Sequence, residues 1–176
     1  MKTKDIKKEI KDFFFTNPTT KLRVRQIERS VKVPLPSVIR YTTELEKEGI
    51  LKSTAIANVK FYSADRISET FLIEKKLSNI KMLFLSGLMD FLVKELSNPL
   101  IIVFGSYAKG EDVENSDIDL YVETSVKNEI MLDKFEKKMQ RRIQIFKYKK
   151  IQDIKNKDLA NNIINGIILN GFLEVF

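Results

Sequence analysis

Apolar residues in the first third of the chain recur at helical spacing, in segments separated by turn-forming residues such as Asn17-Pro18. Shorter runs with β-like composition follow. The pattern predicts five elements in this order: helices over 4–16, 22–31 and 37–47, then strands over 50–55 and 59–63. Ser37 is expected to cap the third helix at its N-terminus. Ile56-Ala57-Asn58 is expected to turn the two strands into a hairpin.

The next stretch, residues 66–96, contains no proline and carries a wide apolar stripe, which predicts a helical connector. A break is expected at Ser78-Asn79 or at Ser86-Gly87. The second half of the connector is expected to pack on the domain that follows. The first half could instead pair with a second copy of the chain, which predicts a homodimer.

After Pro99 the pattern alternates between strands and helices. The predicted order is strand 100–104, helix 106–110, strand 117–123, helix 128–140, strand 141–147 and helix 156–170. A small mixed sheet flanked by helices satisfies this order.

The chain therefore predicts two domains, in an α+β or α/β arrangement, which 176 residues can hold. The expected boundaries are 1–66 for the first domain, 67–97 for the helical connector and 98–176 for the second domain.

The amino-acid composition limits the kinds of metal site and catalytic mechanism that the chain can have. The chain has no cysteine and no histidine, which excludes disulfides, thiolate or imidazole metal sites and every mechanism that needs an imidazole base. Hydrophobic residues make up 43% and charged residues 31%, which is normal for a globular protein. No apolar run is long enough to span a membrane, and the start has no apolar segment like that of a signal peptide. We expect a cytoplasmic protein without a membrane partner.

The net charge of +7 is unevenly distributed. Residues 1–66 contain 15 Lys and Arg against 8 Asp and Glu, whereas residues 67–176 contain 16 of each. Such asymmetry indicates a polyanionic partner for the first domain. A Lys-rich surface that only keeps the domain soluble remains the alternative.

The strongest chemical signal lies between residues 104 and 120. Asp117 and Asp119 alternate with apolar residues on a predicted strand, so both carboxylates should project from one face. Adjacent carboxylates repel unless a cation lies between them, and oxygen ligands suit Mg²⁺ or Mn²⁺. Gly105-Ser106 forms a turn before a helix, where free backbone N–H groups suit phosphate. A turn that can bind phosphate, next to two carboxylates that can bind a metal ion, predicts transfer of a nucleotidyl group.

The same residues resemble a known family. Gly105-Ser106-x-Ala108-x-Gly110, followed by Ser116-Asp117-x-Asp119-Leu120, is similar to the signature of the DNA polymerase β-like nucleotidyltransferases, especially the minimal ones. The resemblance covers roughly residues 80–171, including a closing helix with Gly166-Ile167-Ile168-Leu169-x-Gly171. It implies Asp117 and Asp119 as catalytic metal ligands. It also implies nucleoside triphosphate binding by Gly105, Ser106, Lys109 and Gly110.

One position departs from this family. A third carboxylate usually comes from a later strand, and the matching position here is Gln144. An amide can coordinate a metal through its oxygen, but it carries no charge and cannot act as a base. Loss of such a group could lower the rate by orders of magnitude. Glu123, four residues beyond Asp119, should lie too far away to replace it, at about 13 Å along the strand.

Residues 36–51 resemble the recognition helix and wing of a winged helix-turn-helix domain. By position, Ser37 and Arg40 on the helix would face DNA, and Arg23, Arg25, Lys52 and Lys60 would contact phosphate. The negative charges of Glu44, Glu46 and Glu48 disfavour DNA contact at the C-terminal half of the helix. Docking of a protein is the alternative use of such a domain.

Two functions are consistent with these features. The first is a Mg²⁺-dependent enzyme that transfers a nucleoside monophosphate from a triphosphate to a protein or nucleic-acid hydroxyl. The resemblance also implies a HEPN-like helical partner in a toxin–antitoxin system. The second is a non-catalytic DNA-binding transcription regulator whose degenerate nucleotidyltransferase domain binds a nucleotide or a partner protein. A protein-interaction module without DNA is a third reading.

Overall fold

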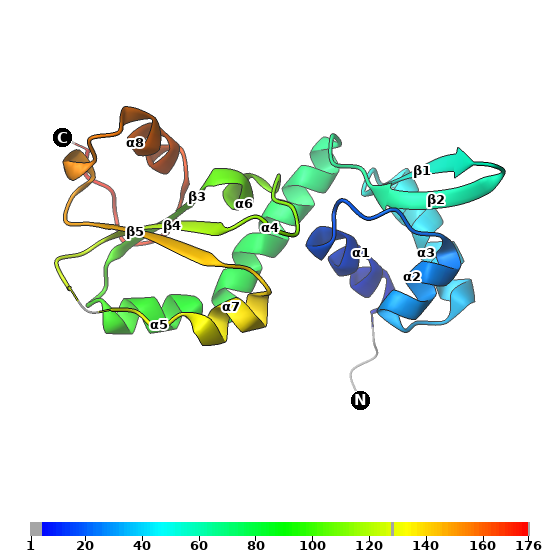
Figure 1. Ribbon diagram of the computed structural model, residues 1–176, viewed down its shortest axis with the longest axis horizontal. Coiled ribbons are helices and arrows are strands. Elements are labelled where there is room, and N and C mark those ends of the chain that lie inside the picture. The colour runs from blue at the N-terminus through cyan, green and yellow to red at the C-terminus, as the bar shows by residue number, and fades with distance from the viewer. Residues whose placement is uncertain (1–4, 128, 176) are drawn as a thin grey trace. The chain divides into compact units, whose positions relative to one another are not determined.

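The computed structural model describes residues 5–127 and 129–175 (Figure 1). It divides the chain into two compact units, Met1–Ser78 and Asn79–Phe176. The division falls within the stretch that the sequence predicts as a helical connector. No helix in the described part of the chain is both long and apolar enough to cross a membrane.

The first unit consists of three helices, a two-stranded antiparallel sheet and the beginning of a fourth helix. The elements are α1 (Ile6–Thr16), α2 (Val24–Val31), α3 (Leu35–Lys47), β1 (Leu51–Ile56) and β2 (Val59–Ala64). Fully buried side chains from all three helices form the core, among them Ile10, Phe14, Ile27, Val38 and Leu45.

The predicted hairpin is confirmed, because β1 and β2 pair in register from Leu51–Ala64 to Ile56–Val59. Ala57 and Asn58 form the turn with φ of 46° and 61°. Two consecutive positive φ values match the twist of a tight hairpin. Leu22 exchanges backbone hydrogen bonds of 2.9 and 2.8 Å with Tyr62, which ties the segment before α2 to the hairpin.

Two predicted helix starts are wrong. The third helix begins at Leu35 after Pro34, so Ser37 lies inside its first turn and is not the cap. Pro36 is tolerated in this turn because the N–H that it lacks would have no helical partner. The second helix begins at Val24, since Leu22 is held in the bridge to Tyr62.

The connector forms α4 (Glu69–Leu85) and α5 (Leu88–Glu95). The break lies at Ser86-Gly87, the second of the two predicted positions, whereas Asn79 lies inside α4. Gly87 has a φ of +83°, a conformation that favours glycine. The Ser86 hydroxyl donates to the Leu83 carbonyl and accepts from the Leu88 N–H, which stabilises the break.

The second unit contains a four-stranded mixed sheet. Its strands are β3 (Leu100–Phe104), β4 (Ile118–Glu123), β5 (Ile143–Tyr148) and β6 (Ile167–Asn170), in the order β5-β4-β3-β6. β3 is antiparallel to β4 and β6, and β4 is parallel to β5. The remaining elements are α6 (Gly105–Lys109), α7 (Asp133–Met139), a 3₁₀ turn (Ile151–Asp153) and α8 (Lys157–Ile164).

Helices cover both faces of this sheet (Figure 1). On one face, α5 and α7 pack on the alternating residues of β3 and β4 that include Val103 and Leu120. On the other, α8 and the 3₁₀ turn pack on Phe104 and Tyr121. Asp119 alternates with Leu120 and therefore lies on the α8 face.

The predicted closing helix, residues 156–170, is wrong. α8 ends at Ile164, and residues 167–170 form β6 against β3. Gly166 permits this close approach, since a Cβ there would lie 2.6 Å from the Val103 carbonyl oxygen. The helix predicted over 128–140 is also shorter than expected, spanning Asp133–Met139, and residue 128 lies outside the described residues.

Candidate functional site

The turn between β3 and α6 lies against the first residues of β4. Phe104 is opposite Asp119 in the β3–β4 register, and Gly105 follows with a φ of +73°. A Cβ at Gly105 would lie 2.6 Å from Oδ2 of Asp119. The Asp119 carboxylate can therefore approach the backbone of this turn only because residue 105 is glycine.

Asp117 and Asp119 are both partly exposed, the first just before β4 and the second within it. Burial raises the pKa of the Asp119 carboxyl, and the negative charge of Asp117 raises it further. The two carboxylates thus lie close enough to repel each other, and a cation between them would relieve that repulsion.

Gln144 lies beside this pair. In the parallel register of β4 and β5 it is the partner of Asp119, and its side chain is exposed. This register agrees with the strand alignment that assigns Gln144 to the third position, and the assignment itself stays a prediction. Within the described residues, no group of three or more His, Cys, Asp or Glu side chains could hold a metal ion. Two carboxylates and an amide oxygen nevertheless suit a hard divalent cation.

Glu123 is engaged elsewhere. Its Oε2 accepts a hydrogen bond of 2.7 Å from the Tyr121 hydroxyl and one of 3.0 Å from the Ile151 N–H. Burial and this contact raise the pKa of Tyr121. Glu123 therefore anchors the 3₁₀ turn, and the site has no nearby carboxylate to replace Gln144 among the described residues. Glu136 is also engaged, because it accepts a hydrogen bond of 2.9 Å from the Ile143 N–H at the start of β5.

The other residues predicted to bind nucleotide lie along α6. Ser106 is in its first turn and is partly exposed, and Lys109 is exposed in its last turn. The first N–H groups of a helix have no partner within it, so the Gly105–Ser106 end has backbone donors to offer. Gly110 is buried and ends the helix with a φ of +77°. In the structure it therefore acts as the C-cap of α6.

A buried polar cluster holds the loop that leads to Asp117. Asp112 is 1% exposed, and its Oδ1 accepts a hydrogen bond of 2.7 Å from the Asn79 amide. Its Oδ2 lies 3.5 Å from the guanidinium of Arg141, which also donates to the Glu114 carbonyl. Asn79 donates further to the Tyr107 carbonyl, at 2.9 Å. Sequence reasoning missed this cluster, because no local pattern joins residues so distant in the chain.

Residues 85–169 match the family model of the nucleotidyltransferase domain. The match covers slightly less than half of the chain and includes the turn at Gly105, both aspartates and Gln144. No curated protein and no solved structure matches the chain. The chain thus contains a nucleotidyltransferase-like domain, and the sheet of the second unit agrees with a small version of that fold.

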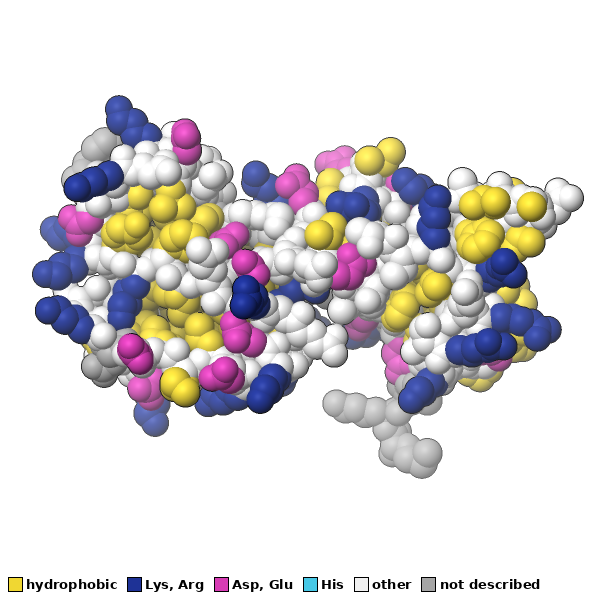
Figure 2. Space-filling model, viewed as in Figure 1, with side chains coloured by type: hydrophobic (Ala, Val, Ile, Leu, Met, Phe, Trp, Pro, Cys, Tyr) yellow, Lys and Arg dark blue, Asp and Glu magenta, His cyan; other side chains and the backbone are white. Residues whose placement is uncertain are grey.

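The basic residues predicted to contact DNA occupy different surroundings in the first unit. Three of them pair with carboxylates: Arg40 with Glu44 at 2.9 Å, Lys60 with Glu46 at 2.8 Å, and Lys52 with Asp65 at 3.5 Å. Ser37 is partly buried in α3. Figure 2 shows Lys and Arg side chains close together over α2 and α3.

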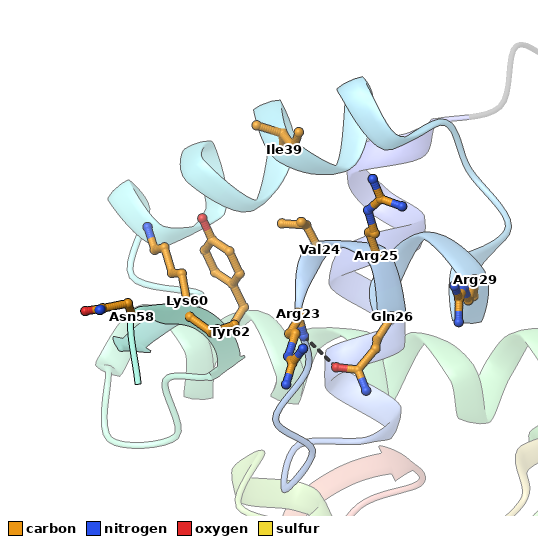
Figure 3. A pocket seen from close by; sticks show the side chains of 10 residues that line it. Arg23, Val24, Arg25, Gln26, Arg29, Ile39, Asn58, Lys60 and Tyr62 are labelled. Atoms are coloured by element: carbon orange, nitrogen blue, oxygen red, sulfur yellow. Dashed lines mark hydrogen bonds between the residues drawn. The ribbon is translucent and has the colours of Figure 1, made fainter. Parts of the chain in front are cut away.

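Arg23, Arg25 and Lys60 are among the residues that line a pocket of about 730 Å³ (Figure 3), although Arg23 and Arg25 extend from opposite sides of α2. Arg29, which sequence reasoning missed, also lines it, whereas Ser37, Arg40 and Lys52 do not. The i, i+4 spacing of Arg25 and Arg29 on α2 is the signal that could have revealed Arg29.

Proposed function

We propose that the nucleotidyltransferase-like domain binds a nucleoside triphosphate with Mg²⁺ or Mn²⁺ and transfers its nucleoside monophosphate, at a low rate, to a hydroxyl group. The observation that carries this proposal is the approach of the Asp119 carboxylate to Gly105 beside the charge of Asp117. Metal ligands and phosphate donors then occupy one small region of the surface.

In this proposal Asp117 and Asp119 hold the divalent cation, which would neutralise phosphate charge. The N–H groups at Gly105 and Ser106 bind the β- and γ-phosphates, and Lys109 adds positive charge. The acceptor oxygen bonds to the α-phosphorus, and the bond from this phosphorus to the pyrophosphate oxygen breaks. The hydroxyl proton passes to solvent, because the Gln144 amide cannot take it. The missing base is the reason for the low rate.

Incubation of the full chain with α-labelled triphosphates, Mn²⁺ and a cell extract tests this activity. We expect label to appear on an acceptor, and to be absent with the Asp117→Asn plus Asp119→Asn variant. Label transferred equally by this variant would place the chemistry elsewhere.

A second proposal concerns the first unit, which we infer to be a winged helix-turn-helix that binds DNA. Its support is the order of three helices and a hairpin, together with the excess of basic residues. DNA binding by the first unit, together with the neutral Gln144 in the second, supports an alternative to the enzyme. In this alternative the protein is a non-catalytic regulator that senses a nucleotide.

Duplex binding measured against salt concentration tests this second proposal. Affinity should fall steeply as salt rises, since bound phosphates release counterions. An affinity independent of salt would contradict phosphate contact by the basic unit.

A further inference from the structure

The arginines of α2 differ from the other basic residues of the first unit. Arg40, Lys52 and Lys60 have carboxylate partners. Arg23, Arg25 and Arg29 form no ion pair within the described residues, although Arg23 lies over the Phe61 ring at 5.1 Å. Like charges one helical turn apart, as at Arg25 and Arg29, disfavour the helix unless an anion compensates them. The unit thus concentrates on α2 arginines that have no ion-pair partner among the described residues, and Glu28 is the only acidic residue of this helix.

These arginines border the pocket between α2, α3 and the hairpin (Figure 3). Its volume of about 730 Å³ lies within the range of roughly 300–1,000 Å³ that small-molecule sites occupy. Figure 3 shows the Tyr62 ring and Lys60 extending from the hairpin toward α3, with Val24 beside them and Arg25 on the same side of α2. Arg23 and Gln26 extend from the other side of α2.

The lining combines two chemistries. Apolar surface comes from Val24, Ile39 and Val59, of which Ile39 is 50% exposed. The polar lining consists of cations, amides and a phenol, and none of the described lining residues is acidic. A fitting ligand therefore combines a negative group with an apolar one, and a nucleotide is one such ligand.

We propose that this pocket receives an unpaired nucleotide of a nucleic-acid strand, with its phosphate at the arginines of α2 and its base against the apolar lining. Unpaired bases pack on apolar and aromatic side chains and on guanidinium planes, whereas paired bases are hidden in the duplex. The excess of positive charge beyond the pocket favours a strand over a free nucleotide. This inference rests on the proposed nucleic-acid binding by the first unit and specifies its ligand.

Fluorescence anisotropy with the full chain tests the proposal. The probes are a blunt DNA duplex and the same duplex with a four-nucleotide 3′ overhang, at one salt concentration. We expect the overhang to tighten binding about tenfold, a gain typical of base stacking. The variant Arg25→Gln plus Arg29→Gln should lose this gain. Lys76→Gln plus Lys94→Gln removes the same charge from exposed positions outside the pocket and should keep it.

The remaining outcomes distinguish failure of the pocket proposal from failure of the proposed nucleic-acid binding by the first unit. Equal affinity for both probes, or a gain kept by the arginine variant, would overturn the pocket proposal while leaving duplex binding intact. Absence of binding to either probe would overturn both. Competition by a free nucleoside monophosphate at concentrations close to those of the overhang would contradict a strand as the ligand.

Discussion

Asp119 and Gln144 are direct neighbours across the parallel pair β4–β5, and Asp119 also lies against Gly105 at the end of β3. This relationship separates binding from catalysis in the proposed site. The carboxylate pair suits a metal–nucleotide complex, whereas the amide supplies neither charge nor a base.

The first prediction restores the missing carboxylate. Gln144→Asp should raise the rate of nucleotidyl transfer at least tenfold, because positioned bases contribute about 10²–10⁴-fold. The rate of label transfer from an α-labelled triphosphate measures the effect. Gln144→Asn, which stays neutral, is the control and should give no rise. An unchanged rate in Gln144→Asp would contradict the role that we assign to this position.

The second prediction uses the close approach at Gly105. Gly105→Ala places a Cβ 2.6 Å from Oδ2 of Asp119 and forces alanine to a φ of +73°, so the carboxylate must move. We expect loss of triphosphate binding and a fall of about 1–3 kcal/mol in the free energy of unfolding.

Gly87→Ala provides the matched control for this substitution. Its φ of +83° is similar, but a Cβ there meets no atom within 4 Å. Its unfolding free energy should therefore fall while triphosphate affinity remains. Equal loss of triphosphate affinity in both variants would show that the effect at Gly105 is one of stability alone.

The third prediction concerns pH. Since burial and Asp117 raise the pKa of Asp119, its ionised form is disfavoured in the folded state. This cost is full above the raised pKa, shrinks as pH falls through it, and vanishes below the lower pKa that the carboxyl has in the unfolded chain. Without metal, Asp119→Asn should therefore unfold at a higher temperature than the wild-type chain at neutral pH. The difference should shrink on acidification. A variant that is less stable at neutral pH would contradict this electrostatic account.

The fourth prediction concerns the loop before Asp117. Arg141→Met removes a cation that lies 3.5 Å from the buried Asp112 carboxylate, which should lower the unfolding free energy by about 3–5 kcal/mol. Asp112→Asn plus Arg141→Met should recover much of this loss, because neither position then carries a buried charge. Chemical denaturation of both variants measures the difference, and an equal loss in both would show that burial of charge is not the cause.

The local parts of the site could be predicted from sequence. The Gly-Ser turn and the alternation of Asp117 and Asp119 are short-range patterns, and the family resemblance directed attention to Gln144. The β6 strand was missed because a short apolar run such as Ile167–Leu169 fits a helix or a strand equally well. Only its position beside β3, made possible by Gly166, decides between them. Likewise, the contact of Asp112 with Arg141 depends on tertiary packing.

The most direct test is a titration of the full chain with a nucleoside triphosphate, in the presence and absence of Mn²⁺, monitored by calorimetry. The account predicts Mn²⁺-dependent binding by the wild-type chain and a loss of at least tenfold in affinity for Asp119→Asn. Binding that is independent of Mn²⁺, or equal in wild type and variant, would contradict a metal–nucleotide site at the two aspartates.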